Sequence, residues 1–319
     1  FSVEKVTNDF FNQYKEKYLE LKEFLEKNPS FIEESKKLGF KVEKFSEQFA
    51  KKLMGQLAFL YFIQKKGWLG VRIMPENHTF TTATYNNFFD SQDSIHRNVL
   101  KKVFVQSNNE SIRLSSNKIE QLDNHEIDLL SDCFVNSEFN MPWDSGNKKF
   151  IRDIFDFCTT NTNKNFFEEY LEPLFYEALN EKRKNQYFRK FNCKIPFLNG
   201  GLFDPLEGYN WKDINLEIPN DMFSNVTEKG REATGILDIF DRYNFTINEN
   251  EPLEQDVAID PEMLGKIFEN LLDVTDRKSK GAYYTPREIV HYMCQESIIN
   301  YLVNKVNVPY DDIKQFIIY

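Results

Sequence analysis

The sequence Leu57-Ala58-Phe59-Leu60-Tyr61-Phe62-Ile63 is the longest apolar run in this chain of 319 residues. It lies inside a helix that the spacing of apolar residues predicts over 42–66. Because the run is apolar on every side, we expect other elements to surround its second half. Gly67 follows as a C-terminal stop, and Trp68 and Leu69 should pack just beyond it.

Working outward from this helix, most of the chain also predicts helices. Residues 9–27 carry an amphipathic stripe, and a second strong stripe begins at Asn165 and continues past Pro173, where we expect a bend. The weaker pattern of residues 75–124 predicts short helices joined by mobile loops. Short β-favouring segments, among them 216–218 and 243–247, predict a minor sheet between about 195 and 250. The fold class is therefore mainly α, a multi-helix domain with a small minor β element.

The charge balance limits how this chain could meet nucleic acid. Forty Lys and Arg against 50 Asp and Glu give a net charge of −10, which repels polyanions and anionic membranes. Any DNA contact must therefore be local. The one concentrated basic stretch contains Lys182, Arg183, Lys184, Arg189 and Lys190. It is either a solvated helix end or a strip that contacts phosphates, and we carry these five residues forward as weak DNA-binding candidates.

Composition also bears on compartment and on enzyme class. Four widely spaced cysteines form no CxxC pair, which suits a reducing cytoplasm, and no apolar run approaches the ~20 residues of a membrane span. The sequence contains no GxSxG, GxxxxGK, HExxH or GxGxxG motif, so we expect none of the enzyme classes that those motifs mark. Since the first residue is Phe1 and the last, Tyr319, ends an apolar run, we expect the chain to be part of a longer protein.

Two short segments match half of a metal-nuclease signature. Glu20-Leu21-Lys22 and Glu34-Ser35-Lys36 each place an acid two residues before a lysine. Both fall in charge-rich helical surroundings, and neither follows a suitably placed Pro-Asp. Ion pairing on a helix surface explains them better, so we predict no metal ligand in this chain.

The most informative stretch precedes a helix that begins near residue 286. Thr285 is a natural N-cap, Pro286 takes the first helical position, and Glu288 completes a capping box. The free amides and the positive end of the helix dipole favour an anion, and Tyr283 and Tyr284 could wall such a site. A small zwitterion would suit it; the alternative is an ordinary capped helix.

The same helix continues with an apolar face that we expect to be buried, and a preceding helix should begin at Asp260-Pro261-Glu262. The residues of the apolar face are Ile289, Val290, Met293, Ser297, Ile298 and Leu302.

Residues 281–290, Gly-Ala-Tyr-Tyr-Thr-Pro-Arg-Glu-Ile-Val, resemble motif X of S-adenosylmethionine-dependent DNA methyltransferases that methylate amino groups. In that family the Tyr-Thr-Pro segment opens a helix that holds the methionine part of the cofactor. The resemblance assigns this cofactor-binding role to Tyr283, Tyr284, Thr285 and Pro286. Segments 195–203, 241–246 and 260–269 are similar to the lead-in of large adenine-specific enzymes, in particular of type IIG restriction-modification enzymes.

The resemblance implies three parts. These are a helical domain over 1–160, a helical or mixed connector with short strands over 161–258, and the truncated start of a methyltransferase α/β domain over 259–319. The intact enzyme would bind double-stranded DNA and transfer a methyl group from S-adenosylmethionine to N6 of a flipped adenine. The glycine-rich loop and the Asn-Pro-Pro-Tyr segment that follow motif X in the family are missing from this sequence. We therefore expect no catalytic residue in this chain and no activity from it alone. Mg²⁺ would be needed only by a nuclease domain outside it.

One competing interpretation belongs to another class of protein. The chain could be a non-enzymatic helical scaffold that binds DNA or a partner protein, with Thr285 merely capping a helix. A standalone metal nuclease is a third and remote alternative. The sequence leaves open the recognised DNA site and the oligomeric state.

Overall fold

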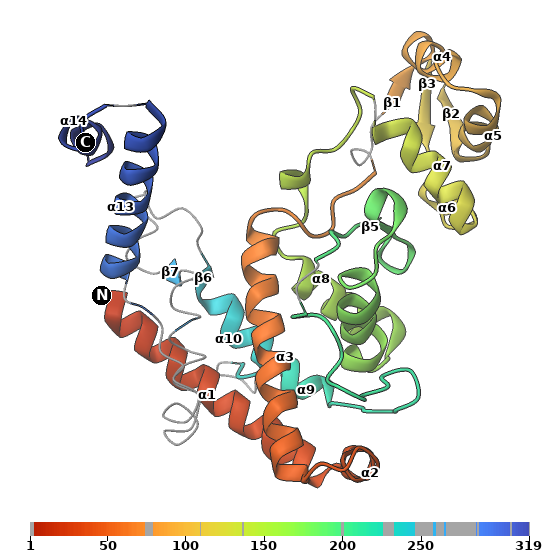
Figure 1. The fold of residues 1–319 in the computed structure, drawn as a ribbon. Coiled ribbons are helices and arrows are strands. Elements are labelled where there is room, and N and C mark those ends of the chain that lie inside the picture. The colour runs from red at the N-terminus through yellow and green to blue at the C-terminus, as the bar shows by residue number, and fades with distance from the viewer. Residues whose placement is uncertain are drawn as a thin grey trace. The chain divides into compact units, whose positions relative to one another are not determined.

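A computed structural model of the chain describes residues 3–73, 79–108, 110–135, 137–198, 201–225, 233–245, 258–259, 265, 285, 287–306 and 308–318. The chain divides into two compact units, Phe1–Pro261 and Glu262–Tyr319. Helices predominate in both, and the sheets are small (Figure 1). The prediction of a mainly α, multi-helix fold with a minor β element is therefore confirmed.

The first unit contains most of the elements. Its helices are α1 (Val3–Lys27), α2 (Pro29–Lys37), α3 (Val42–Lys65), α4 (Thr82–Asp90), α5 (Ser94–Val103), α6 (Ser116–Ile119), α7 (Asn124–Val135), α8 (Phe150–Phe157), α9 (Asn220–Phe223) and α10 (Ile236–Arg242). Its strands are β1 (Thr79–Thr81), β2 (Phe104–Asn108), β3 (Ser111–Leu114), β4 (Tyr187–Phe188), β5 (Cys193–Lys194), β6 (Asn244–Phe245) and β7 (Ala258–Ile259). The second unit contains α13 (Arg287–Val306) and α14 (Tyr310–Ile318).

Helix α3 is the central helix that its sequence predicts. Leu57 and Leu60 have no exposed surface, and α3 packs against α1 and α8 (Figure 1). The Tyr61 ring stacks on the Phe240 ring of α10 with centroids 4.9 Å apart. The Phe10 ring of α1 contacts the Phe240 ring edge-on, with centroids 5.7 Å apart. Burial of these large side chains is the main stabilising contribution to this part of the unit.

A smaller lobe follows α3, and its sheet differs from the prediction. Residues 79–135 form α4 to α7 around an antiparallel sheet of order β1-β3-β2, where only short helices and loops were expected. Phe80 and Phe104 are buried in the lobe's core, with ring centroids 5.5 Å apart. The other residues of these strands are mostly polar and at least partly exposed. β1 and β3 alternate polar and apolar residues, but only over three and four residues, which is too short a pattern to predict a strand.

The segment after α8 continues as helical turns of a wider kind. Hydrogen bonds of π type run through Cys158–Thr162, Phe167–Leu171 and Pro173–Ala178. Pro173 has no amide hydrogen to donate and stands at the start of the third stretch. This segment is followed by the two-residue strands β4 and β5, which pair antiparallel.

Three further expectations need correction. Trp68 is 38% exposed, whereas Leu69 is fully buried. Residues 216–218 form no strand, although Leu216 and Ile218 are buried. Among the described residues, β6 lies in the predicted range and pairs in parallel with β7, which lies beyond residue 250.

The apolar face predicted for α13 is also not buried. Ile289, Val290 and Met293 are 50%, 44% and 58% exposed, and Ile298 is half exposed, whereas Ile299 has no exposed surface. A local pattern shows that a face is apolar, but burial requires another element against it. The helix predicted from Asp260 lies outside the described residues, apart from helical Gly265.

None of the helices in the described ranges is long and apolar enough to cross a membrane. The first metal-nuclease segment takes part in helix-surface ion pairs, as predicted: Lys22 pairs with Glu26 at 3.2 Å, and Glu20 pairs with Lys17. In the second segment Glu34 is buried and lies 4.0 Å from Lys37. The boundary predicted at residues 160 and 161 stays a prediction.

Candidate functional site

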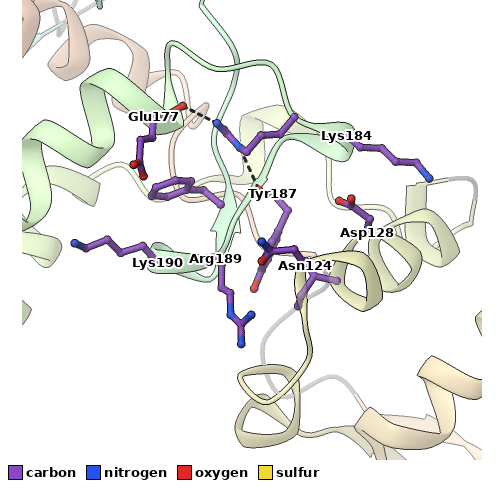
Figure 2. A pocket seen from close by; sticks show the side chains of 10 residues that line it. Asn124, Asp128, Glu177, Lys184, Tyr187, Arg189 and Lys190 are labelled. Atoms are coloured by element: carbon purple, nitrogen blue, oxygen red, sulfur yellow. Dashed lines mark hydrogen bonds between the residues drawn. The ribbon is translucent and has the colours of Figure 1, made fainter. Parts of the chain in front are cut away.

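The basic stretch of residues 182–190 lines a cavity of about 440 Å³ in the first unit (Figure 2). One wall comes from the first turns of α7, and the other from the chain between the π-helical segment and β5. The lining residues are Asn124, Ile127, Asp128, Glu177, Arg183, Lys184, Tyr187, Phe188, Arg189 and Lys190. The structure therefore brings four of the five basic candidates to one cavity. The fifth, Lys182, is exposed beside it.

Arg183 serves the fold at the end of the helical segment. Its Nη1 donates to the backbone carbonyls of Glu177 (2.7 Å) and Glu181 (3.0 Å), and its Nη2 donates to those of Ala178 and Ile195. Its Nε donates to the carbonyl of Tyr187 at 3.2 Å. A guanidinium has five N–H donors, and all five are occupied here. Arg183 thus joins carbonyls at the end of the helical segment to those of Tyr187 and Ile195, and it has no donor left for a phosphate.

Lys184 and its neighbour join this chain segment to α7. The ammonium of Lys184 lies 2.5 Å from Asp132 Oδ2, and this hydrogen bond raises the pKa of Lys184 above its usual value. Asn185 donates to Asp132 Oδ1 at 2.8 Å and adopts a left-handed backbone with φ of 56°. These bonds place the basic segment against the lobe formed by α4 to α7.

Arg189 and Lys190 are two further exposed cations of the cavity, beside Lys184. Nη2 of Arg189 donates to the Glu120 carbonyl at 3.0 Å, while the Lys190 ammonium lies 3.5 Å from Glu169 Oε2 and 5.4 Å from the centre of the Tyr170 ring. In Figure 2 the side chains of Lys184, Arg189 and Lys190 point in different directions. Cations that diverge in this way suit successive phosphates of an extended polyanion better than one small anion.

The predicted cofactor segment lies in the second unit, at the start of α13. Thr285 is exposed and lies two residues before Arg287, the first residue of this 20-residue helix. The N-cap role of Thr285 stays a prediction; a cap there would leave neighbouring amides able to meet a carboxylate. Tyr283, Tyr284 and Pro286 lie outside the described residues.

A second group of basic residues escaped the sequence analysis. Lys65, Lys148, Lys149, Arg152 and Arg242 surround another cavity of the first unit, of about 430 Å³. Three separate segments supply them, around residues 65, 148–152 and 242, so no long basic run appears in the sequence. The adjacent pair Lys148-Lys149, placed directly before a helix, is the one local signal that could have been noticed.

Comparison with known proteins gives one significant similarity. No known protein family matches the chain, and no solved structure matches it. A curated protein of the archaeon Methanocaldococcus jannaschii, named "Putative type II restriction enzyme and methyltransferase", is 34% identical over 151 residues. The match covers 45% of this chain and 12% of that protein, so the chain corresponds to only a small part of its relative. Over that stretch, this chain is similar to a protein named for both restriction and methylation.

Proposed function

We propose that this chain is part of an adenine-specific DNA methyltransferase of the restriction-modification kind, which uses S-adenosylmethionine. The observation that carries the proposal is the 34% identity to a protein named as a restriction enzyme and methyltransferase. The motif X-like segment at residues 281–290 is a second sequence feature that supports it.

Each part of the chain has a role in this proposal. The segment before α13 would hold the methionine part of the cofactor, with helix amides facing the carboxylate of that part. The residues of this segment are Tyr283, Tyr284, Thr285 and Pro286. The exposed cations Lys182, Arg189 and Lys190 would contact the phosphate backbone of double-stranded DNA, while Arg183 keeps their segment in place. The cofactor supplies the methyl group, and the residues that hold the target adenine lie outside residues 1–319. Mg²⁺ would be needed only if the protein also has a nuclease domain outside this chain.

The proposal is tested with the intact protein, tritiated S-adenosylmethionine and duplex DNA. We expect label in N6-methyladenine, identified by nucleoside chromatography after digestion. T285A and Y284A should each weaken cofactor binding about fivefold, because each removes one contact of about 1 kcal/mol. Wild-type protein that labels no adenine would contradict the assignment.

A matched control separates cofactor binding from helix capping. Thr81 is the N-cap of α4, where its Oγ1 accepts a hydrogen bond from the Thr84 amide at 3.1 Å. T81A should lose a cap, at a cost of about 1 kcal/mol in stability, and leave the cofactor Kd unchanged. If T285A and Y284A behave like T81A, the scaffold interpretation is the better one.

A further inference from the structure

The exposed lysines of the first basic cavity are held by carboxylates of the fold. The Lys184 ammonium lies 2.5 Å from Asp132 Oδ2, and the Lys190 ammonium lies 3.5 Å from Glu169 Oε2. Carboxylate and phosphate oxygens accept the same charge-assisted hydrogen bonds from an ammonium group. A phosphate that contacts either lysine must therefore replace a carboxylate of the protein. The two ion pairs thus compete with any polyanion that binds at this cavity.

Asp132 does not depend on Lys184 for a hydrogen-bond donor. Its Oδ1 accepts the Asn185 side chain at 2.8 Å, and His96 Nε2 lies 3.9 Å from its Oδ2. Burial by itself would raise the pKa of Asp132, but the hydrogen bonds from Lys184 and Asn185 lower that pKa, so the carboxylate is charged at neutral pH. Its side chain is 26% exposed, so water reaches it as well. Asp132 therefore keeps partners when Lys184 leaves.

The segment that carries Lys184 also stays in place without this ion pair. Asn185 donates to the Asp128 carbonyl of α7 at 3.2 Å, and Tyr187 belongs to the buried core of the lobe formed by α4 to α7. The Lys184 side chain, by contrast, is 60% exposed. Exposed ion pairs add little to stability, because water and salt screen them. Lys184 can therefore exchange its partner at small cost to the fold.

Lys190 forms an ion pair of the same kind. Its partner Glu169 also accepts the Lys164 ammonium, at 3.2 Å, on the same Oε2. All three side chains are at least 35% exposed, so these ion pairs are weak as well. Each of the two cavity lysines therefore faces a carboxylate that has another donor.

From these contacts we propose that Asp132 and Glu169 are internal competitors of DNA, which hold Lys184 and Lys190 in the free protein and release them to the phosphates of a duplex. This inference rests on the proposed function for its choice of duplex DNA, and it adds Lys184 to the residues that contact the backbone there. A single small anion would replace one carboxylate with no gain in charge. A strand of phosphates reaches several cations at once, so it is the ligand that displaces both carboxylates.

The test measures binding of the intact protein to a fluorescent duplex of about 30 base pairs by anisotropy, in about 0.15 M salt, which screens charges beyond about 8 Å. D132N keeps an acceptor oxygen for Asn185 and loses the charge that holds Lys184. It should bind the duplex about threefold more tightly, because DNA no longer has to break an exposed ion pair. K184Q has no cation to release, so D132N/K184Q should bind no more tightly than K184Q.

The second ion pair gives a test that does not depend on the folding of D132N. E169Q keeps an acceptor oxygen for Lys164 and should also tighten binding about threefold, and E169Q/K190Q should show no gain over K190Q. E126Q is the matched control, since Glu126 also lies on α7 and pairs with Lys102, which does not line the cavity. It makes the same change in net charge as D132N and should keep the wild-type affinity.

The inference is overturned by unchanged affinity in D132N and E169Q, by a gain that persists when the lysine is also replaced, by an equal gain in E126Q, or by wild-type protein that binds no duplex DNA. Methyl transfer by the same preparations separates this failure from that of the proposed function. Active wild-type enzyme with unchanged affinity in D132N and E169Q refutes only the competing ion pairs. Lysine-dependent gains without any methyl transfer refute only the methyltransferase assignment.

Discussion

At the scale of single residues, Glu172 carries the clearest electrostatic consequence. It is fully buried, and its Oε1 accepts the Tyr209 hydroxyl at 2.8 Å, while Oε2 has no hydrogen-bond partner among the described residues. Burial, against the opposing effect of the Tyr209 hydrogen bond, raises the pKa of Glu172 from 4.5 to about 8. The folded protein therefore keeps this carboxyl protonated at neutral pH.

This pKa predicts a pH-dependent stability. Between pH 4.5 and about 8 the unfolded chain releases the Glu172 proton and the folded chain keeps it, so stability falls as pH rises, by up to about 1.4 kcal/mol per pH unit. E172Q removes this contribution, and its stability relative to wild type should increase from about pH 5 to pH 8. Urea unfolding at several pH values measures the difference. Y209F should keep the wild-type trend, and parallel profiles for wild type and E172Q would show that the carboxyl is ionised in the fold.

Arg183 leads to a second prediction at this scale. Because its five donors satisfy five backbone carbonyls, R183A should lower the free energy of unfolding by about 3 kcal/mol, and R183K should recover less than half of that. K182Q, an exposed neighbour, should stay within about 0.5 kcal/mol of wild type. Chemical denaturation measures the free energy of unfolding of the three variants. If R183K were as stable as wild type, the positive charge of Arg183 and not its five hydrogen bonds would stabilise the fold.

At the scale of elements, the end of α3 meets the loop before α8 through two glycines. Gly67 has φ of +73°, and a Cβ there would lie 2.2 Å from the Asp144 carbonyl oxygen. A Cβ on Gly146 would lie 2.3 Å from the carbonyl oxygens of Gly67 and Leu69. Only glycine allows this close backbone approach, on which the position of Lys148 and Lys149 depends.

The two glycine environments provide a matched pair of substitutions. Gly39 has nearly the same φ, +74°, but no atom lies within 4 Å of a Cβ placed there. G39A should cost about 1 kcal/mol, for the backbone conformation alone. G67A adds a backbone clash and should cost at least about 2 kcal/mol more. Thermal unfolding of both variants measures these losses of stability. Equal losses in G39A and G67A would contradict the close approach of the two backbone segments at Gly67.

At the scale of the whole molecule, the cysteines test the folds of both units. Cys133, Cys158 and Cys193 are buried in the first unit, whereas Cys294 of α13 is exposed. Burial raises the pKa of Cys133 and Cys193 to about 12, which leaves almost no reactive thiolate at neutral pH.

A thiol reagent should therefore distinguish Cys294 from the other three. We use a disulfide reagent that releases a coloured thiolate when it reacts with a cysteine, and follow the absorbance of that product. We expect one thiol per chain to react rapidly in the native protein and all four to react in denaturant. C294S should abolish the rapid phase. A second thiol that reacts as fast as Cys294 would show that one of the buried sites is open.

Sequence by itself determined the helices whose apolar residues repeat with the helical period. The stripes of α1 and α3 predicted both helices, and Gly67 marked the end of α3, because these signals are local. The predicted cap at Thr285 and the basic stretch 182–190 rest on local signals for the same reason. The sheet of β1 to β3 was not predicted, since its strands are too short for their residue pattern to mark them and form by pairing with one another.

Only the tertiary structure decided what those residues do. A basic run does not show whether a cation faces solvent or a carbonyl, and Arg183 proved to bind five carbonyls. Lys65, Arg152 and Arg242 lie far apart in sequence, and packing of α3, α8 and α10 brings them beside Lys148 and Lys149. Periodicity reports the character of each helix face, but distances between charges are set only when the faces pack.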